Sequence, residues 1–268
     1  MNRIVNAIKG RLPAHFADRM EERIGGLRDF ERLESHDSSA LTITCDDSAR
    51  RDQDIVSVLD SQNLKGVISV SPDLVGTDGF LDYAALRDMQ AGGHELAFHG
   101  NDHSPFTDIH PLRKLTDSVA EGLSRLQDQG LSTQTVVYPC GNNNRRIRQA
   151  LAPFFRAGVS TWFGVNSGKR INRYSIRRVP FGAYASQHAP SEHWYRDMID
   201  VALREPRWII LMLHPGSTEH TPDHTAMLQR LTQYALERGL PIRSVSEHLD
   251  TLQPEPVRGN DHFQAGVS

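Results

Sequence analysis

The feature that most constrains the fold is a series of short apolar runs separated by amphipathic segments. The apolar runs are LTITC at 41–45, GVISV at 66–70, ELAF at 95–98, TVVYP at 135–139 and WIILML at 208–213. Helical patterns occupy 53–63, 81–91, 112–129, 144–157 and 222–238, and PIRSV at 241–245 indicates one more strand. Short buried strands that alternate with helices are typical of a parallel sheet joined by crossover connections.

The order of these elements predicts an α/β fold with one main domain, residues 39–252. We expect a distorted, incomplete (β/α) barrel, TIM-like and with about seven strands, because 268 residues suit one such barrel. Residues 1–38 carry apolar side chains at a spacing of three to four, which predicts an N-terminal helical extension. Residues 253–268 are polar and are predicted to form a C-terminal tail.

The composition is typical of a soluble globular protein, with 38% hydrophobic residues, 24% charged residues and a formal net charge of −3. This charge gives no bulk attraction to nucleic acid or anionic membranes, so neither is expected as a partner. The sequence shows no signal-peptide core and no apolar run near the roughly 18 residues of a membrane span, which favours a cytoplasmic location. Cys45 and Cys140 are expected to be free thiols. The oligomeric state is left open.

Two adjacent carboxylates, Asp46 and Asp47, follow the first apolar run directly. Polar residues at the C-terminal ends of parallel strands form the active sites of α/β barrels. Adjacent side chains point in different directions from an extended chain, so one carboxylate can bind a metal while the other stays free as a base. A helix N-cap or a solvated turn is the competing interpretation of such a pair.

His99 and His103 follow the run ELAF. If this segment is helical, the two imidazoles lie on one face, about 6 Å apart, and can bind one ion. With an aspartate from an earlier strand end they make a two-histidine, one-carboxylate set. Such a set suits zinc, iron or cobalt and leaves positions for water and substrate.

His214 emerges from the most apolar run, in the segment LMLHP. A histidine in this place is often only a half-buried residue with satisfied hydrogen bonds. Its position at a strand end also suits a general acid.

Taken together, the segments TITCDDS, HGNDH, VVYPCG and LMLHP resemble, in this order, the motifs of the polysaccharide deacetylase (NodB-type) family. The resemblance covers about residues 39–250 and includes NRYSIRRVPFG at 172–182. It implies a metal-dependent deacetylase that acts on amide bonds other than peptide bonds. Three positions depart from the family pattern, since Cys45 replaces a phenylalanine, Ser48 a glycine and Cys140 an aromatic residue.

The resemblance also implies roles for individual residues. Asp46 is expected to be the catalytic base. The expected metal ligands are Asp47, His99 and His103. His214, held as imidazolium, is expected to protonate the leaving amine. Zinc is the expected ion, with cobalt, iron and nickel as alternatives.

Further roles follow from the same resemblance. Arg178 is expected to orient the base, with Arg177 as the alternative. The third motif of the family, in which the backbone N–H after the proline helps to hold the developing oxyanion, matches Tyr138, Pro139, Cys140 and Gly141. Three aromatic residues are considered for stacking on a pyranose face, with burial in the core as the competing interpretation: Trp162, Tyr184 and Trp194.

The expected function is removal of an N-acetyl group from an N-acetylated sugar, oligosaccharide or polysaccharide by attack of metal-activated water. One alternative is a related deacylase or deformylase that acts on a nucleotide-linked or lipid-linked sugar or on a small amide. Another is a catalytically inactive carbohydrate-binding module. The sequence does not specify the sugar or its chain length.

Overall fold

The computed structural model describes residues 32–34, 38–167, 170–185 and 190–254. Its central strands are all parallel: β2 (Ala40–Cys45), β3 (Val67–Val70), β4 (Glu95–Phe98), β5 (Thr135–Val137), β6 (Ala157–Phe163), β9 (Ile176–Pro180) and β10 (Arg207–Leu213). They are hydrogen-bonded in this order, and β10 also pairs with β2, so the seven strands close into a barrel. The predicted distorted barrel of about seven strands is confirmed.

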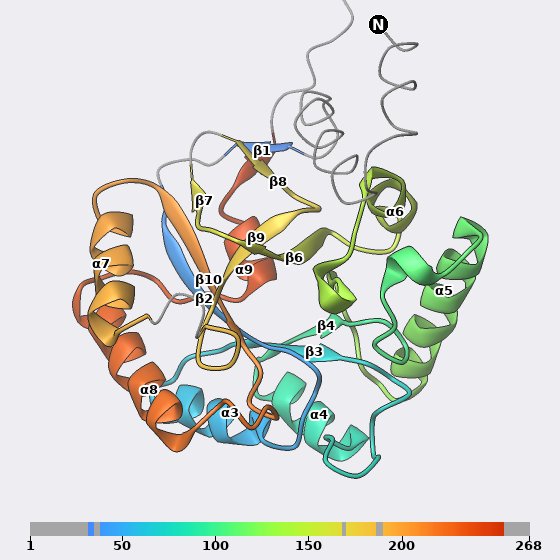
Figure 1. Ribbon diagram of the computed structural model, residues 1–268, viewed down its shortest axis with the longest axis horizontal. Coiled ribbons are helices and arrows are strands. Elements are labelled where there is room, and N and C mark those ends of the chain that lie inside the picture. The colour runs from blue at the N-terminus through green and yellow to red at the C-terminus, as the bar shows by residue number, and fades with distance from the viewer. Residues whose placement is uncertain (1–31, 35–37, 168–169, 186–189, 255–268) are drawn as a thin grey trace, which may run out of the picture.

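Helices cover the outside of the barrel (Figure 1). In chain order they are α3 (Asp52–Ser61), α4 (Tyr83–Ala91), α5 (Leu112–Asp128), α6 (Arg145–Leu151), α7 (Glu192–Ala202) and α8 (Pro222–Glu237). The short helix α9 (Val245–Leu249) lies behind the strands, and two 3₁₀ turns, η1 (Phe106–Asp108) and η2 (Pro139–Gly141), follow β4 and β5. Within the described ranges, no helix has the length and apolar character needed to span a membrane.

A small second sheet has the strand order β11 (Gln253–Pro254), β1 (Arg32–Glu34) and β8 (Arg170–Asn172). The strand β7 (Asn166–Ser167) belongs to the main sheet and pairs antiparallel with the start of β10. Most of the predicted N-terminal extension, residues 1–31 and 35–37, lies outside the described residues, as do residues 255–268 of the predicted tail. The described part of the extension is the strand β1 and not a helix, because β8 and β11 pair with it on both sides.

The interior of the barrel changes from apolar to polar along the strands. At the N-terminal ends of the strands, Ala40, Val67 and Trp208 form an apolar cluster that α9 contacts. Further along, the indole Nε1 of Trp208 donates to Thr42 Oγ1 at 2.8 Å, and the next interior position of β2 is Thr44. Buried polar groups are therefore concentrated toward the C-terminal end of the barrel.

Two expectations about secondary structure are wrong. The helix predicted at 144–157 ends at Leu151, because Pro153 lacks the N–H that a further turn needs, and β6 begins four residues later. The segment 241–245 is not a strand, since Ile242 forms only an isolated bridge to β2 and α9 begins directly after Ser244. The strands β6 and β9 and the helix α7 had no counterpart in the prediction.

Candidate active site

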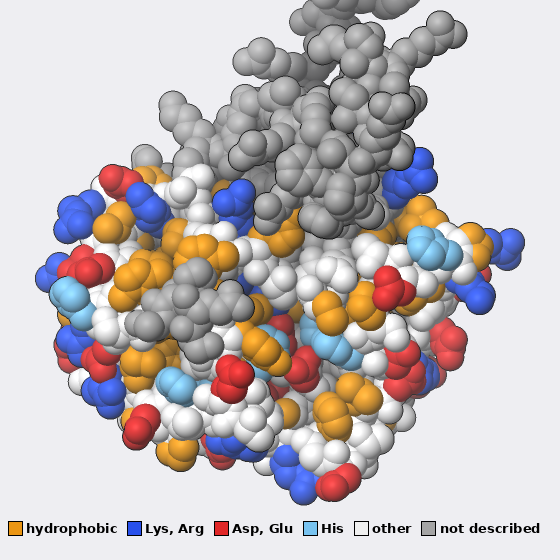
Figure 2. Space-filling view, in the orientation of Figure 1, with side chains coloured by type: hydrophobic (Ala, Val, Ile, Leu, Met, Phe, Trp, Pro, Cys, Tyr) orange, Lys and Arg blue, Asp and Glu red, His pale blue; other side chains and the backbone are white. Residues whose placement is uncertain are grey.

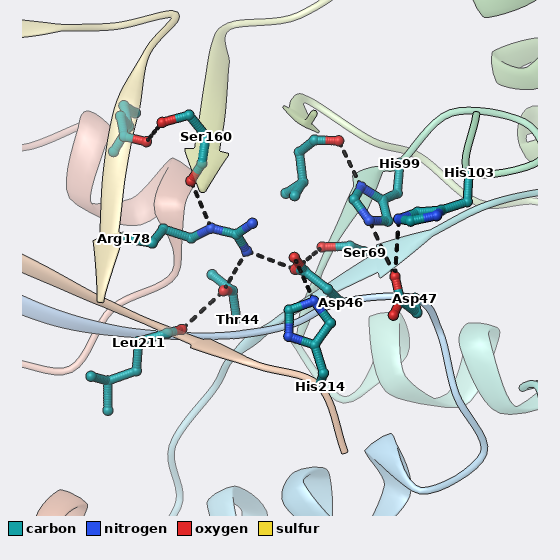
Figure 3. A network of polar contacts seen from close by, with 12 residues as sticks. Thr44, Asp46, Asp47, Ser69, His99, His103, Ser160, Arg178, Leu211 and His214 are labelled. Carbon is teal, nitrogen blue, oxygen red and sulfur yellow. Dashed lines mark hydrogen bonds and ion pairs between the residues drawn. The ribbon is translucent and has the colours of Figure 1, made fainter. Parts of the chain in front are cut away.

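The polar residues that the sequence indicates meet at the C-terminal ends of the barrel strands (Figure 3). Asp46 and Asp47 follow β2, His99 follows β4 and His214 follows β10, while His103 lies in the loop after His99. The side chains of Asp47 and His103 are 37% and 36% exposed, so the cluster is open to solvent on one side. Figure 2 shows histidine and acidic side chains gathered near the centre of the face it presents.

Asp47, His99 and His103 form a cluster with the geometry of a metal site. Oδ1 of Asp47 lies 3.4 Å from Nε2 of His99 and 3.3 Å from Nε2 of His103. The three potential ligand atoms all lie within 4.8 Å of one another. Within the described part of the chain, this buried Asp47 oxygen makes no hydrogen bond. A divalent cation among these atoms would complete the coordination that the oxygen lacks.

The orientation of His99 and the pKa of His103 also fit a metal. Nδ1 of His99 lies 2.7 Å from the carbonyl oxygen of Val137. Because a carbonyl only accepts, Nδ1 is the donor of this hydrogen bond, and Nε2 is the ring nitrogen that faces the cluster. Burial lowers the pKa of His103, and the nearby His99 lowers it further against the opposing effect of Asp47. Two imidazoles and one carboxylate suit zinc or cobalt.

A loop, and not a helix, brings His99 and His103 together. Gly100 and His103 adopt positive φ angles of 73° and 65°, and the two imidazole centroids lie 4.8 Å apart with planes tilted by 58°. The side-chain amide of Asn101 fastens the loop by donating to the backbone oxygen and the hydroxyl of Ser118 in α5, at 2.8 and 2.9 Å. The helical arrangement considered for the two histidines is therefore not formed, although both lie close to Asp47.

Asp46 is a buried, ionised carboxylate. Its Oδ1 accepts from Nη1 of Arg178 at 2.7 Å and from Oγ of Ser69 at 3.1 Å. Its Oδ2 lies 3.7 Å from Nε2 of His214. Burial alone would raise the pKa of Asp46, but the charge of Arg178 holds this pKa well below its usual range. Asp46 therefore carries a negative charge at neutral pH.

The walls of the barrel fix Arg178. Its side chain is fully buried, Nε donates to the carbonyl oxygen of Ser160 in β6 at 2.9 Å, and Nη1 donates to Thr44 Oγ1 in β2 at 3.1 Å as well as to Asp46. Arg177, the alternative, is exposed on the opposite side of β9. The arginine that contacts Asp46 is Arg178.

His214 directly follows β10, the strand that pairs with β2, and is neutral. Burial lowers the pKa of His214 by more than the carboxylates of Asp46 and Asp47 raise it. The expectation that His214 is held as imidazolium is therefore wrong for the ground state, because the cost of burying a charged ring outweighs the attraction of its neighbours.

The segment Tyr138–Gly141 forms the turn after β5. Cys140 is exposed and left-handed, with φ of 55°. The N–H groups of Gly141 and Asn142 donate to Tyr138 O and Pro139 O at 2.8 and 3.1 Å, whereas the N–H of Cys140 donates to none of the described residues. Burial raises the pKa of the Cys140 thiol, and the nearby Asp47 raises it further. The turn thus presents one backbone donor near the metal cluster.

The side chain of Tyr138 does not line the site. It is fully buried, its hydroxyl donates to the carbonyl oxygen of Tyr174 at 2.9 Å, and its ring lies edge-on to Phe106. Tyr138 therefore supports the turn from the core.

The three aromatic residues considered for sugar stacking have different surroundings. Trp162 and Trp194 are half-buried, and Trp194 stacks on Phe163 with ring centroids 6.4 Å apart. Tyr184 is 54% exposed, and its ring lies edge-on to His214 at 4.8 Å. Tyr184 is thus in direct contact with a residue of the site.

Sequence reasoning missed several polar residues that support the site. The hydroxyl of Ser69 donates to Asp46, and the hydroxyl of Thr44 accepts from Arg178, which also donates to the backbone oxygen of Ser160. Thr44 precedes Asp46 by two positions and therefore lies on the same, interior face of the strand. Polar residues at alternate positions of an otherwise apolar strand were the signal that could have indicated them.

Comparison with known proteins agrees with this geometry. Residues 34–154 match the family model described as polysaccharide deacetylase. This stretch contains β2 to β5 and the candidate residues Asp46, Asp47, His99 and His103. No curated protein sequence matches the chain. The resemblance to polysaccharide deacetylases that the sequence motifs indicate is confirmed.

Solved structures of carbohydrate esterase family 4 share the fold. A family 4 acetyl xylan esterase from Clostridium thermocellum, in complex with a cobalt ion, is 15% identical with a TM-score of 0.57, covering 80% of this chain and 90% of that chain. The Xyl-CE4 domain of a multidomain xylanase from the hindgut metagenome of Trinervitermes trinervoides is 14% identical with a TM-score of 0.56, covering 80% and 89%. A family 4 pseudoenzyme from Bacillus anthracis is 14% identical with a TM-score of 0.55, covering 81% and 66%.

Proposed function

We propose that this protein is a metal-dependent hydrolase that removes the N-acetyl group from an N-acetylated sugar, oligosaccharide or polysaccharide. The observation that carries the proposal is the cluster of Asp47, His99 and His103 beside the buried, ionised Asp46 and His214. Amide carbonyls are poor electrophiles and amines are poor leaving groups, so the reaction needs an activated water, a stabilised oxyanion and a proton donor. The site holds a group suited to each task.

Asp47, His99 and His103 would hold the divalent ion. Zinc is the proposed ion, with cobalt, iron and nickel as alternatives. When bound, such an ion polarises the substrate carbonyl and lowers the pKa of a water molecule. The exposed side of the cluster gives substrate its access.

Asp46 is the proposed general base. Arg178 keeps its carboxylate ionised, so it can accept a proton from the attacking water. Arg178 and Ser69 both bind Oδ1, and Oδ2 faces His214. The free oxygen of the base is thus the one nearest to the proposed acid.

His214 is the proposed acid, and it acquires its proton during the reaction because it is neutral beforehand. The 3.7 Å between His214 Nε2 and Asp46 Oδ2 closes to hydrogen-bond distance with a small movement. We therefore propose that one proton passes from water to Asp46, then to His214, and finally to the amine nitrogen as the carbon–nitrogen bond breaks.

The backbone N–H of Cys140 is the proposed oxyanion donor. The turn holds it in a left-handed conformation, while the following two N–H groups are used inside the turn. A backbone donor does not depend on its side chain, so the replacement of an aromatic residue by Cys140 preserves it.

A sugar substrate is supported by the family match and by structural neighbours that are named as an acetyl xylan esterase and a xylanase domain. We propose a cytoplasmic location, which favours small or precursor sugars over a finished polymer. A related deacylase acting on a nucleotide-linked or lipid-linked sugar fits the same chemistry. The pseudoenzyme among the neighbours makes an inactive carbohydrate-binding module the second candidate.

Release of acetate tests the proposal. The zinc-loaded or cobalt-loaded protein would be assayed on N-acetylglucosamine, chitooligomers and a nucleotide-linked N-acetyl sugar, with Asp46→Asn as the matched inactive variant. We expect release that stops on chelation and is strongly reduced in Asp46→Asn. Binding of chitooligomers without any release of acetate would refute the hydrolase and support the binding module.

A further inference from the structure

Within the described residues, the side chain of His214 has a polar contact at only one of its two ring nitrogens. Its Nε2 faces Asp46, but its Nδ1 is buried and makes no hydrogen bond to the residues that the structure describes. Catalytic and metal-binding histidines are commonly oriented by a hydrogen bond to the second ring nitrogen. Some other contact therefore has to fix the direction of this imidazole.

The ring of Tyr184 packs against the imidazole of His214. The ring centroids are 4.8 Å apart and the planes meet at 82°, an edge-to-face arrangement. Tyr184 is 54% exposed, so core packing does not account for where its ring lies.

The backbone of Tyr184 is strained, with φ of 62°. The left-handed region is unfavourable for a bulky side chain, and such outliers persist where surrounding contacts hold them, often at functional sites. Here the N–H of Tyr184 donates to Oε2 of Glu219 at 3.1 Å. Glu219 lies in the loop that His214 begins, where the N–H of Ser217 donates to the carbonyl oxygen of His214 at 3.0 Å. One loop therefore carries the histidine and anchors the tyrosine against it.

We propose that Tyr184 is a positioning residue for His214: its ring restricts rotation of the imidazole and keeps Nε2 directed at Asp46 and the leaving amine. This inference rests on the proposed role of His214 as the acid. The contact is made by the aromatic ring, so the hydroxyl is not needed. Phenylalanine at position 184 should therefore hold the imidazole as tyrosine does, and alanine should not.

Two substrates with different leaving groups test whether Tyr184 acts through His214, because only the amide needs a proton from His214. The metal-loaded full chain, Tyr184→Ala and Tyr184→Phe would be assayed on an N-acetyl sugar and on an aryl acetate ester, whose leaving group scarcely needs a proton. We expect Tyr184→Ala to lower kcat on the amide about tenfold or more and on the ester less than about threefold, with Tyr184→Phe within about twofold of the parent on both. Equal losses on amide and ester in Tyr184→Ala would overturn the proposal.

A second measurement does not depend on activity. Carbon-13 relaxation of a labelled His214 imidazole, assigned with His214→Ala, reports how mobile the ring is in each metal-loaded protein. We expect greater mobility in Tyr184→Ala and parent-like mobility in Tyr184→Phe, and unchanged mobility in Tyr184→Ala would overturn the proposal. A parent that hydrolyses neither substrate would refute the proposed function, and the relaxation data would still decide whether Tyr184 holds the ring.

Discussion

Gly122 of α5 lies directly against Asn101 of the loop between His99 and His103. A Cβ atom on Gly122 would overlap Oδ1 of Asn101 and come within 2.8 Å of the ring of Phe98. The side-chain amide of Asn101 donates to the backbone oxygen and the hydroxyl of Ser118, one turn earlier in α5. The helix therefore sets the position of the loop between the two histidines at a residue without a side chain.

Gly122→Ala should push Asn101 and its loop away from α5. We expect the affinity for zinc to fall by about 10-fold to 100-fold, the range typical of losing a residue that supports metal ligands. Calorimetric titration with Zn²⁺ measures this. Ser124→Ala, at an exposed position of the same helix, is the control because it adds helix propensity without overlap. Equal affinities of Gly122→Ala and the parent would contradict the role given to this contact.

The purified protein should hold about one divalent ion per chain. His99→Ala and His103→Ala should each lose it, because a two-ligand site binds zinc far more weakly than a three-ligand site. Elemental analysis after gel filtration gives the ratio of metal to protein. His193→Ala, which removes an exposed histidine of α7, should keep the parent ratio. Full metal content in both triad variants would disprove the site.

The two adjacent carboxylates should differ in what they contribute. Asp46→Asn should keep the metal yet lose roughly 10²- to 10⁴-fold in kcat, the range of general base catalysis. Asp47→Asn should instead weaken metal binding, since its Oδ1 is the oxygen that faces both imidazoles. Metal content and kcat measured on the same preparations separate the two effects. Undiminished activity of Asp46→Asn would remove Asp46 as the base.

His214→Ala should retain metal and slow the breakdown of the tetrahedral intermediate. The loss in kcat should be larger for an amide than for an aryl acetate, because the phenolate leaves without needing a proton. Steady-state assays on both substrates measure the two losses. If they are equal, His214 is not the acid.

His248, remote from the chemistry, should make folding stability depend on pH. It is fully buried against Trp208, and burial lowers its pKa to about 4, compared with about 6.5 in the unfolded chain. Below pH 6.5 the unfolded state takes up a proton that the folded state does not accept until about pH 4. This contribution to stability is thus complete above pH 6.5 and is lost as the pH falls toward 4, by up to about 1.4 kcal/mol per pH unit.

Urea unfolding of the metal-free protein at about pH 7 and about pH 5 tests this effect of His248. His248→Phe should reduce the loss of unfolding free energy between the two values, because phenylalanine does not titrate. His193→Ala, with an exposed ring, should show the parent dependence on pH. The expectation fails if the parent and His248→Phe lose the same free energy.

Much of the fold could be predicted because the apolar runs of a parallel barrel are short, continuous and buried on both faces. The strands that were not predicted mix polar residues or glycine with apolar ones. In β6, Gly158 and Ser160 interrupt the apolar sequence, and β9 places Arg177 and Arg178 in its middle. A strand with a buried arginine cannot be recognised by hydrophobicity, because the arginine is tolerated only through partners that distant strands supply.

The candidate site was predicted more fully in its residue types than in its geometry. The pair Asp46 and Asp47 and the histidines His99 and His103 could be named because they follow strands, and the resemblance to polysaccharide deacetylases distinguished the ligand Asp47 from the base Asp46. The left-handed turn at His103 could not be predicted, since its conformation depends on contacts between the loop and α5. The neutral state of His214 likewise depends on burial, which is a property of the folded barrel.

The closure of the barrel between its first strand, β2, and its last, β10, has a consequence for biosynthesis. These strands pair through six residues that end at Cys45 opposite Leu213, and the N–H of Asp46 donates to Leu213 O, so the base and His214 become neighbours only through this ladder. The proposed metal ligands all precede β5. During synthesis, the proposed base and the proposed acid therefore come together only when the final strand docks, after all three proposed metal ligands have been made.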